Sequence, residues 1–363
     1  MGKIISVVGA RPNFIKIAPV HRAFEKYEPE FQHLICHTGQ HFDEKMSKIF
    51  FDELNMPKPA FYLGISGGSH AIQTARIMTE FEQILLSEKP DMIVVPGDVN
   101  STMACSLVAS KMGIPIAHVE AGLRSFDRTM PEEINRLVTD ALSDLLFVSE
   151  ESGMKHLKNE GIDDSKVHFV GNVMIDSLVS YLPNIKESGV LAELELTEKE
   201  FILVTFHRPA NVDHPDYLIE LIDFLNELSA SKKVVFPIHP RTRNNLKTNN
   251  LLDRIGENIL LLDPVGYIDF LRLTMTARLV VTDSGGIQEE TTWLGVPCVT
   301  VRDNTERPVT VTIGTNTLAG TNLKKVRTAV KEVLDGNLKN GKIPDLWDGK
   351  TAERIAKIIT AQF

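Results

Sequence analysis

The segment RLVVTDSGGIQEETTWLGVP, residues Arg278–Pro297, predicts a strand, a tight turn and a short helix. Leu279–Val281 is a short run rich in β-branched residues, which is typical of a buried parallel strand. Thr282–Ser284 are residue types that cap helices, and the pair Gly285-Gly286 lets the backbone bend sharply and approach a ligand. The chain is therefore expected to contain at least one strand–turn–helix unit of a parallel α/β sheet.

The helix in this segment is short, because Gly295 suits a left-handed cap and Pro297 cannot continue the helix. A strand that runs through Ser284-Gly-Gly into a helix directs free N–H groups and a positive dipole end at one point, which is a site for a phosphate. Glu289 and Glu290 follow in the helix, and one of them can accept the hydroxyls of a sugar. Phosphate together with sugar hydroxyls indicates a nucleotide or a nucleotide-sugar.

Composition limits the classes of protein that fit. The 363 residues carry a net charge of −9, from 48 acidic and 39 basic residues, which argues against a nucleic-acid or anionic-membrane binder. The three cysteines, Cys36, Cys105 and Cys298, lie far apart and cannot all pair, so a reducing compartment is expected. With no apolar run of 18 residues and a strand-like N-terminus, we expect a cytoplasmic protein.

Strand and helix patterns alternate along the whole chain, which predicts parallel sheets with helices on both faces. The cycle restarts at the strand Phe201–Thr205, after a crossing near 171–176. The predicted fold is therefore α/β, with two doubly wound, Rossmann-like domains that face a cleft. We expect an N-terminal domain over 1–170 and a ligand-binding domain over 171–349, with a final helix at 350–363 packing back on the first domain.

Polar clusters follow the predicted strands at their carboxyl ends, where open parallel sheets bind ligands. In the first half these clusters supply mostly carboxylates, and in the second half mostly phosphate-binding groups. No paired histidine spacing, Walker lysine loop or dinucleotide glycine pattern is present, so neither a metal nor another cofactor is expected. The clusters are Gly9/Arg11, Gly39-Gln40-His41, Asp98 and Glu120, followed by His207/Arg208, His239/Arg241, Ser284 with its glycines, and Arg302/Arg307.

Each residue also has a structural interpretation. Asp98 can simply cap the helix that follows it, and Glu132–Glu133 lie at a helix start, where carboxylates are common. His207 can belong to an ion pair, and His118, inside a strand, is expected to be a hydrogen-bonded core histidine. Glu120 is the least easily explained as a cap, because Asp or Ser is more usual directly after a strand.

Taken together, the motifs resemble those of the non-hydrolysing UDP-N-acetylglucosamine 2-epimerases of bacteria. They cover the chain nearly from end to end in the order of that family, and the motifs at 118 and 283 are long enough to be specific. The matching motifs are GARP (9–12) with Lys16, TGQH (38–41), GD (97–98), HVEAGLR (118–124), PEEINR (131–136), TFHR (205–208), DSGGIQEE (283–290) and the segment Arg302–Pro308.

The resemblance implies a glycosyltransferase-B-like architecture, a homodimer, and interconversion of UDP-GlcNAc and UDP-ManNAc for surface polysaccharide synthesis. It also implies a route in which UDP is eliminated to give a glycal and then adds back, with proton transfer at C2 of the sugar. Carried over by motif, Asp98, Glu120 and Glu132 transfer protons and His207 assists departure of the diphosphate. Substrate is bound by Arg11, Lys16, Arg136, Phe270, Ser284, Gly285, Gly286, Glu290 and Arg307, while Gln40 and His41 belong to a possible allosteric region.

Two positions depart from the family pattern and leave the sugar open. The family commonly has His-Arg-x-Glu-Asn where this chain has HRPAN (207–211), and Asn13-Phe14 stands where Glu-Ala is frequent. An epimerase of a UDP-2,3-diacetamido-uronic acid fits the same framework. A glycosyltransferase of the same architecture and a hydrolysing relative that releases UDP are the alternatives from other reaction classes.

Overall fold

The structure is a computed structural model that describes residues 2–39, 54 and 56–363. The chain divides into two compact units. Unit 1 comprises Met1–Ser180 and Asp345–Phe363, and unit 2 comprises Tyr181–Pro344. The sequence placed the domain boundaries at 170/171 and 349/350, whereas the compact units divide at 180/181 and 344/345. Among the described residues, no helix is both long and apolar enough to cross a membrane.

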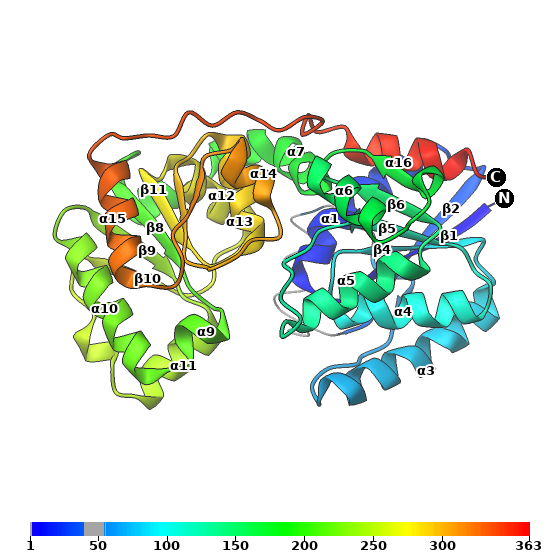
Figure 1. The fold of residues 1–363 in the computed structure, drawn as a ribbon, viewed down its shortest axis with the longest axis horizontal. Coiled ribbons are helices and arrows are strands. Elements are labelled where there is room, and N and C mark those ends of the chain that lie inside the picture. The colour runs from blue at the N-terminus through cyan, green and yellow to red at the C-terminus, as the bar shows by residue number, and fades with distance from the viewer. Residues whose placement is uncertain (1, 40–53, 55) are drawn as a thin grey trace. The chain divides into compact units, whose positions relative to one another are not determined.

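Unit 1 is built on a parallel sheet of seven strands in the order β3-β2-β1-β4-β5-β6-β7. Figure 1 labels β1, β2, β4, β5 and β6 of this sheet. The strand order reverses between β1 and β4, which is where doubly wound sheets bind ligands. The C-terminal helix α16 packs against α1. The elements are β1 (Gly2–Val8), α1 (Arg11–Glu25), β2 (Phe31–His37), β3 (Phe61–Tyr62), α3 (His70–Glu88), β4 (Met92–Pro96), α4 (Asn100–Lys111), β5 (Ile116–Ala121), α5 (Pro131–Leu142), β6 (Leu145–Val148), α6 (Glu151–Asn159), β7 (Val167–Phe169), α7 (Val173–Glu187) and α16 (Thr351–Thr360).

Unit 2 repeats the design with a parallel sheet of six strands in the order β10-β9-β8-β11-β12-β13. Here the order reverses between β8 and β11. The elements are α8 (Val190–Glu193), β8 (Phe201–Thr205), α9 (Pro209–Val212), α10 (Pro215–Ser229), β9 (Lys233–Pro237), α11 (Pro240–Thr248), β10 (Ile259–Leu262), α12 (Tyr267–Thr276), β11 (Leu279–Thr282), α13 (Gly285–Leu294), β12 (Cys298–Thr300), α14 (Pro308–Thr312), β13 (Asn316–Leu318) and α15 (Leu323–Leu334).

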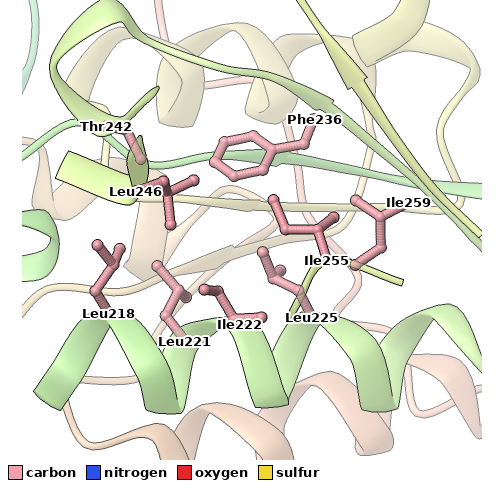
Figure 2. Close-up of a pocket in the computed structure, with 9 residues that line it drawn as sticks. All are labelled: Leu218, Leu221, Ile222, Leu225, Phe236, Thr242, Leu246, Ile255 and Ile259. Carbon is pink, nitrogen blue, oxygen red and sulfur yellow. The ribbon is translucent and has the colours of Figure 1, made fainter. Parts of the chain in front are cut away.

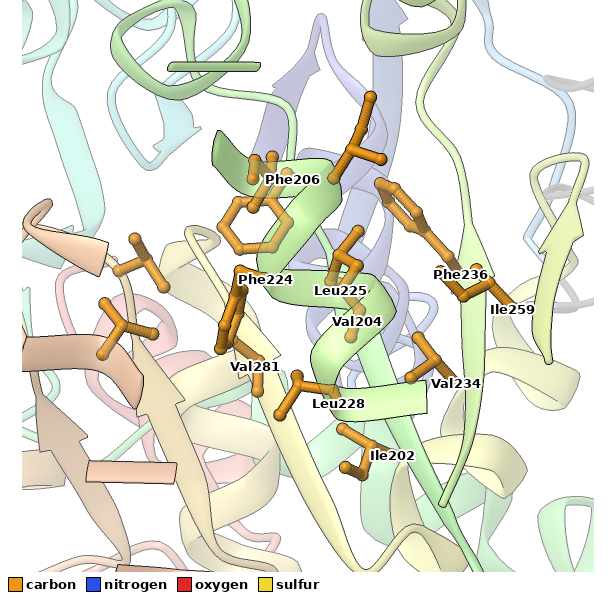
Figure 3. Packing of buried hydrophobic residues seen from close by; sticks show 14 of the residues in the cluster. Ile202, Val204, Phe206, Phe224, Leu225, Leu228, Val234, Phe236, Ile259 and Val281 are labelled. Carbon is orange, nitrogen blue, oxygen red and sulfur yellow. The ribbon is translucent and has the colours of Figure 1, made fainter. Parts of the chain in front are cut away.

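Successive strand residues in unit 2 point to opposite faces of the sheet, and each face is covered by its own helices. Ile202 and Val204 pack against α10 and α15, whereas Leu203 between them packs against α12 and α13. Figure 3 shows the first of these layers, in which Phe224 and Leu225 of α10 lie over the strands. A strand that is buried on both faces needs apolar residues at every position, which explains the continuous apolar run in strands such as Phe201–Thr205.

A small pocket in this layer lies among α10, β9, β10 and α11 (Figure 2). Its lining is apolar apart from Thr242, whose hydroxyl donates to the carbonyl oxygen of Phe206 at 2.6 Å. The pocket therefore offers no polar group for a phosphate or a sugar. It is a gap in the packing of the core and is distinct from the polar strand ends of the same sheet.

The predicted class, two doubly wound parallel sheets, is confirmed. Several elements match the sequence-based ranges, including the strand Phe201–Thr205 and the helix Pro215–Ser229. Others were missed. The segment expected as a crossing leads instead into α7, a helix of 15 residues that runs past the boundary between the units and contains Pro183. The short β13 and α11 were also not predicted.

Candidate active site

The predicted site residues gather at the strand ends that flank the two points where strand order reverses. In unit 1, β1 ends before Gly9 and β4 ends before Gly97-Asp98. In unit 2, β8 ends before His207 and β11 ends before Asp283. Ligands of open parallel sheets bind at such points because neighbouring loops diverge there and leave a crevice.

Asp98 is fixed by contacts on its main chain and its carboxylate. Its side chain is 25% exposed, and its Oδ2 lies 2.5 Å from Nη2 of Arg136. The side chain of Asn135 donates to the carbonyl oxygen of Asp98 at 2.8 Å. The preceding residue, Gly97, has φ +65°, a region that favours glycine. The backbone conformation at position 97 therefore favours glycine, and the carboxylate that follows it at Asp98 stays partly accessible to solvent.

Glu120 lies in a β-bulge of β5. The pairing of β5 with β6 shifts register between Val119 and Ala121, and Glu120 itself has φ +75°, which is uncommon for a residue with a side chain. The bulge turns its carboxylate toward Lys16 of α1, whose Nζ lies 2.5 Å from Glu120 Oε2. Both side chains are almost fully buried, with 6% and 4% exposed. Backbone strain of this kind collects at functional sites.

The ammonium group of Lys16 occupies the space beside Gly97 that a larger residue would fill. A Cβ atom added to Gly97 would lie 2.9 Å from Lys16 Nζ, so any larger residue would displace the ammonium group. Asn13 of the same helix donates to the carbonyl oxygen of Pro96 at 3.2 Å and accepts from the amides of Gly9 and Ala10. The structure therefore brings the first turns of α1 against the ends of β4 and β5.

The two neighbouring glutamates of α5 have different environments. Glu133 is buried, accepts from the amide and hydroxyl of Ser125 and from the amide of Phe126, and pairs with Arg136 at 2.7 Å. Burial alone would raise the pKa of Glu133, but these hydrogen bonds bring it below the ordinary value. Glu132 is exposed in the first turn. Glu133 therefore holds the loop, and Glu132 is the glutamate of this pair that is accessible to a ligand.

Three predicted residues lie wholly or partly outside the described structure. Of Arg11, only the backbone is described, at the start of α1. Gln40 and His41, the possible allosteric residues, lie outside the described residues.

In unit 2, Asp283 joins the ends of β8 and β11. Its carboxylate is buried and accepts from the amides of His207 and Arg208 at 3.0 Å and 2.9 Å and from the side chain of Asn211 at 3.1 Å. Nδ1 of His207 also lies 2.9 Å from Asp283 Oδ1. Burial alone would raise the pKa of Asp283, but His207 and the other donors bring it below the ordinary value. The sequence suggested a cap for α13, whereas Asp283 serves the loop after β8.

His207 is oriented by that carboxylate. Because Nδ1 donates to Asp283, the second ring nitrogen, Nε2, faces away from it, and the side chain is 42% exposed. An aspartate that fixes the tautomer and direction of a histidine is the arrangement used for proton transfer and for anion contacts. The ring of His239 lies 5.7 Å away, centroid to centroid.

The N-terminus of α13 is open to an anion. Ser284 occupies the N-cap position, and in the described part of the chain its side chain makes no capping hydrogen bond. Gly285 and Gly286 form the first turn. Nη1 of Arg307 would lie 2.9 Å from a Cβ atom at Gly285, so the guanidinium lies directly over this glycine. First-turn N–H groups beside a guanidinium make a phosphate site.

Buried carboxylates orient the arginines around α13. Glu289 Oε1 lies 2.8 Å from Nε of Arg307, and Glu306 accepts from both Nη atoms of Arg302 at 2.9 Å and 2.8 Å. Glu306 also lies 3.5 Å from Arg307 Nη1. Glu290 is buried in the same helix. Arginines held by carboxylates are pre-organised, which lowers the entropy lost on binding a diphosphate.

Phe270 lies on α12 and is partly buried against the apolar layer that includes Leu203 and Ile287. Ile287 belongs to α13, so Phe270 packs in the same layer as the helix that begins at Gly285-Gly286. Its hydrophobic surroundings suit the flat face of a base.

Several organising residues were not predicted from the sequence. Asp140, Glu133 and Glu306 each gather two or more donors and are almost fully buried. Glu133 and Arg136 are three residues apart on α5, a spacing that places them on one helix face and is visible in the sequence. Asp140 and Glu306 contact residues whose proximity depends on tertiary structure. Within the described ranges, no group of three or more histidine, cysteine or acidic side chains is arranged to hold a metal ion.

Two doubly wound parallel sheets of this kind define a glycosyltransferase-B-like fold. Residues 23–360 match the profile of the UDP-N-acetylglucosamine 2-epimerase family. The chain is 45% identical over 365 residues to UDP-N-acetylglucosamine 2-epimerase of Methanocaldococcus jannaschii, which covers 99% of each chain. It is 42% identical over 368 residues to UDP-2,3-diacetamido-2,3-dideoxy-D-glucuronate 2-epimerase of Pseudomonas aeruginosa, which covers 98% of this chain and 99% of the relative.

The similarity extends to solved structures. A crystal structure of the UDP-GlcNAc 2-epimerase of Methanocaldococcus jannaschii, in complex with UDP-GlcNAc and UDP, superimposes with a TM-score of 0.92 at 45% identity and covers 99% of each chain. The chain belongs to the UDP-N-acetylglucosamine 2-epimerase family, as the sequence motifs predicted.

Proposed function

We propose that the protein is an isomerase that interconverts UDP-GlcNAc and UDP-ManNAc through elimination and re-addition of UDP. Support comes from the family, from the phosphate site at α13 and from the carboxylates of unit 1. The relative from Methanocaldococcus jannaschii, aligned over nearly its whole length, bears the name of this activity.

Unit 2 binds the uridine diphosphate in this proposal. The N–H groups at Ser284–Gly286 and the guanidinium of Arg307 receive the diphosphate, because both supply donors to an anion. Glu290 accepts the ribose hydroxyls, and Phe270 lines the uracil site. Nε2 of His207 contacts the diphosphate and stabilises it as it leaves C1.

Unit 1 moves the proton in this proposal. The C2 proton of the sugar is not next to a carbonyl group, so its removal must accompany the loss of UDP from C1. Asp98, Glu120 and Glu132 are the carboxylates for this transfer, while Lys16 and Arg136 neutralise and position them. Arg11 contributes to binding of the phosphate or the sugar. In the first half of the reaction, the sugar loses the C2 proton and UDP and becomes the glycal. In the second half, UDP adds back at C1 and a proton adds to the opposite face of C2, so that C2 is inverted.

One observation favours epimerisation over glycosyl transfer. Asp98 and Glu120 lie at the ends of neighbouring strands, and each contacts a buried cation at 2.5 Å, Arg136 and Lys16 respectively. A cation holds its carboxylate ionised and in one orientation, which a general base requires. A glycosyltransferase needs no such pair of proton carriers.

The experiment is incubation of the purified protein with UDP-GlcNAc in deuterated water, followed by NMR. We expect UDP-ManNAc and deuterium at C2 of both sugars, with UDP bound to the sugar at equilibrium. Accumulation of free ManNAc and UDP would instead show hydrolysis. Turnover only after an acceptor is added would show glycosyl transfer and contradict the proposal.

A second sugar is favoured by the 42% identity to the Pseudomonas aeruginosa enzyme named for UDP-2,3-diacetamido-2,3-dideoxy-D-glucuronate. The motif HRPAN, with Pro209 and Ala210 at the start of α9, departs from the usual pattern beside the phosphate site. The same incubation with that UDP-sugar compares the two substrates by kcat/KM.

We further propose a homodimer that supplies precursors for surface polysaccharides in the cytoplasm. The family resemblance supports the dimer and the pathway. The cysteines Cys36, Cys105 and Cys298 are buried and free, which suits a reducing compartment. Light scattering coupled to size-exclusion chromatography measures the mass in solution, and a mass of a single chain would contradict the dimer.

A further inference from the structure

His118 is a fully buried residue of β5 that contacts the turn after β4 and the helix α5. Its Nε2 lies 2.8 Å from the carbonyl oxygen of Gly97, and its Nδ1 lies 2.6 Å from Oδ1 of Asp140. A carbonyl oxygen can only accept a hydrogen bond, so Nε2 carries a proton and donates it to Gly97.

The other ring nitrogen faces a carboxylate that is surrounded by donors. Oδ2 of Asp140 accepts from the amide of Gly122 at 3.1 Å and lies 2.7 Å from Nη2 of Arg124. The backbone amide and the guanidinium are both donors, so the carboxylate of Asp140 acts here as an acceptor. An ionised carboxylate only accepts, so Nδ1 of His118 also carries a proton.

The ionisable groups in this network form two positive and two negative partners, and the outermost, Glu160, is 32% exposed. Arg124 makes a two-point contact with Glu160, with Nε to Oε1 at 2.8 Å and Nη2 to Oε2 at 2.6 Å. His118 and Arg124 supply two positive charges, and Asp140 and Glu160 supply two negative charges. A buried charge is tolerated where it is paired and hydrogen-bonded, which permits a doubly protonated ring at this position.

The network encloses the strained backbone at Glu120. His118 lies two residues before Glu120, and Gly122, whose amide donates to Asp140, lies two residues after it. Glu120 has φ +75° between these anchors. The same ring also holds the carbonyl of Gly97, the residue before Asp98. A strained residue persists only where its surroundings over-determine it, and this network supplies that constraint.

We propose that His118 is a positioning residue that, with a proton on each ring nitrogen, holds the turn at Gly97–Asp98 and the bulge at Glu120 in one fixed arrangement. Its effect on turnover rests on the proposed function, whereas its protonation can be tested without any substrate. His118 does not touch the substrate in this proposal and acts through the two carboxylates.

A second buried histidine provides a control. His33 in β2 is buried, but its Nε2 contacts the hydroxyl of Ser6 at 2.7 Å and its Nδ1 contacts Nδ1 of His21 at 2.7 Å. No carboxylate contacts His33 in the described residues. Burial lowers the pKa of His33 to about 3, so this ring is neutral. The protein therefore contains two buried histidines with opposite expected charge.

The first test is NMR of the wild-type protein labelled with ¹⁵N-histidine and deuterated elsewhere. At about pH 8, where an ordinary histidine with a pKa of about 6.5 is neutral, we expect His118 to show protons on both nitrogens and His33 on one. The His118→Gln and His33→Gln variants assign the two signals. A wild-type His118 with a single protonated nitrogen would overturn the proposal.

The second test compares kinetics. His118→Phe fills the ring volume but removes both donors, and we expect kcat to fall by about 100-fold with KM within about threefold, since a small misplacement has that effect. His118→Gln keeps a donor near Gly97, so its kcat should be about tenfold higher than that of His118→Phe. His33→Phe should lose stability without a comparable fall in kcat. Equal falls in the Phe variants at both positions, or a folded His118→Phe with wild-type kcat, would overturn the proposal.

Asp140→Asn covers the case in which His118→Phe does not fold. The Asn amide can donate to Nδ1 while its oxygen accepts from Gly122 and Arg124, so the shape is kept and the ring charge is lost. We expect the Nδ1 proton to disappear and the Nε2 proton to remain; retention of both protons would overturn the proposal. If the wild-type protein gives no deuterium at C2, the proposed function fails, and the NMR result still decides whether His118 is doubly protonated.

Discussion

Each unit of the protein contains a buried aspartate that contacts a histidine, and the two pairs differ in where the second ring nitrogen points. In unit 1, Asp140 lies 2.6 Å from Nδ1 of His118, whose Nε2 ends on the carbonyl of Gly97. In unit 2, Asp283 lies 2.9 Å from Nδ1 of His207, whose side chain is 42% exposed. The same two side chains therefore form a fully buried pair in one sheet and a pair with an exposed ring in the other.

The difference arises from the strands that carry the pairs. His118 lies inside β5, between two paired strands, whereas His207 follows the last residue of β8. A ring inside a central strand meets the neighbouring strand's backbone, and a ring beyond the strand end meets solvent. In this protein, the position of a histidine inside the strand or just beyond its end thus separates a buried ring from an exposed one.

The largest expected effect is at Glu120. Glu120→Gln keeps the size of the side chain but removes the carboxylate, so deuterium incorporation at C2 should fall by at least about 10³-fold, within the range for loss of a general base. UDP binding, measured by calorimetry, should change by less than about threefold, because the diphosphate site is assigned to unit 2.

Glu88 offers a matched control for that substitution. It forms a Lys–Glu pair with Lys3 at 2.9 Å in the same unit, but both side chains are more than a quarter exposed. Glu88→Gln should leave the exchange rate within about twofold of wild type, because exposed pairs contribute little. Wild-type exchange in Glu120→Gln would remove Glu120 from the proton-transfer set.

The next effect separates the two histidine pairs. His207→Asn keeps a donor near Asp283 but removes the outward nitrogen, so kcat should fall by about 10²-fold while the fold of unit 2 is unchanged. Far-ultraviolet circular dichroism and the urea midpoint check the fold. If the variant loses stability instead of kcat, His207 is an anchor like His118 and the contrast between the units is wrong.

A smaller effect is expected at the phosphate site. Gly285→Ala places a Cβ atom 2.9 Å from Nη1 of Arg307 and should displace the guanidinium. We expect UDP binding to weaken by about tenfold, which corresponds to about 1.4 kcal/mol, as measured by calorimetry. Gly189→Ala in the same unit is the control, because its added Cβ meets only the flexible side chain of Glu193 at 3.5 Å. Equal affinities in both variants would separate Arg307 from the phosphate site.

The sequence predicted the sheets and the strand-end residues because both depend on local patterns. Apolar runs mark buried parallel strands, and the DSGG motif at 283–286 marks a strand–turn–helix with a phosphate site. The contacts that hold the site residues in place could not be predicted from local patterns. Asp140 meets His118 across 22 positions and Asp283 meets His207 across 76, so neither pair forms a local pattern. The bulge at Glu120 was missed for the same reason, because it is a property of pairing between strands.

The smallest effect tests whether a cationic partner decides the state of a buried aspartate. Asp176 is buried in α7 and accepts from the amides of Thr351 and Ala352 at 3.1 Å and 2.6 Å, which caps α16. Burial raises its pKa to about 6, and nearby Asp348 contributes in the same direction. By contrast, Asp140 and Asp283 have a histidine beside them and pKa values below the ordinary value.

The raised pKa of Asp176 fixes the sign of its effect. Its folded pKa of about 6 lies above an unfolded value of about 3.9, so its contribution to stability is full below about pH 3.9 and is lost as pH rises through about 6. Asp176→Asn removes this dependence. The free energy of unfolding of the variant minus that of the wild type should therefore rise by about 2 kcal/mol between about pH 4 and pH 7, measured by urea denaturation. A flat difference over this range would mean that Asp176 does not titrate as a carboxyl of raised pKa, and the contrast with Asp140 and Asp283 would lose its electrostatic basis.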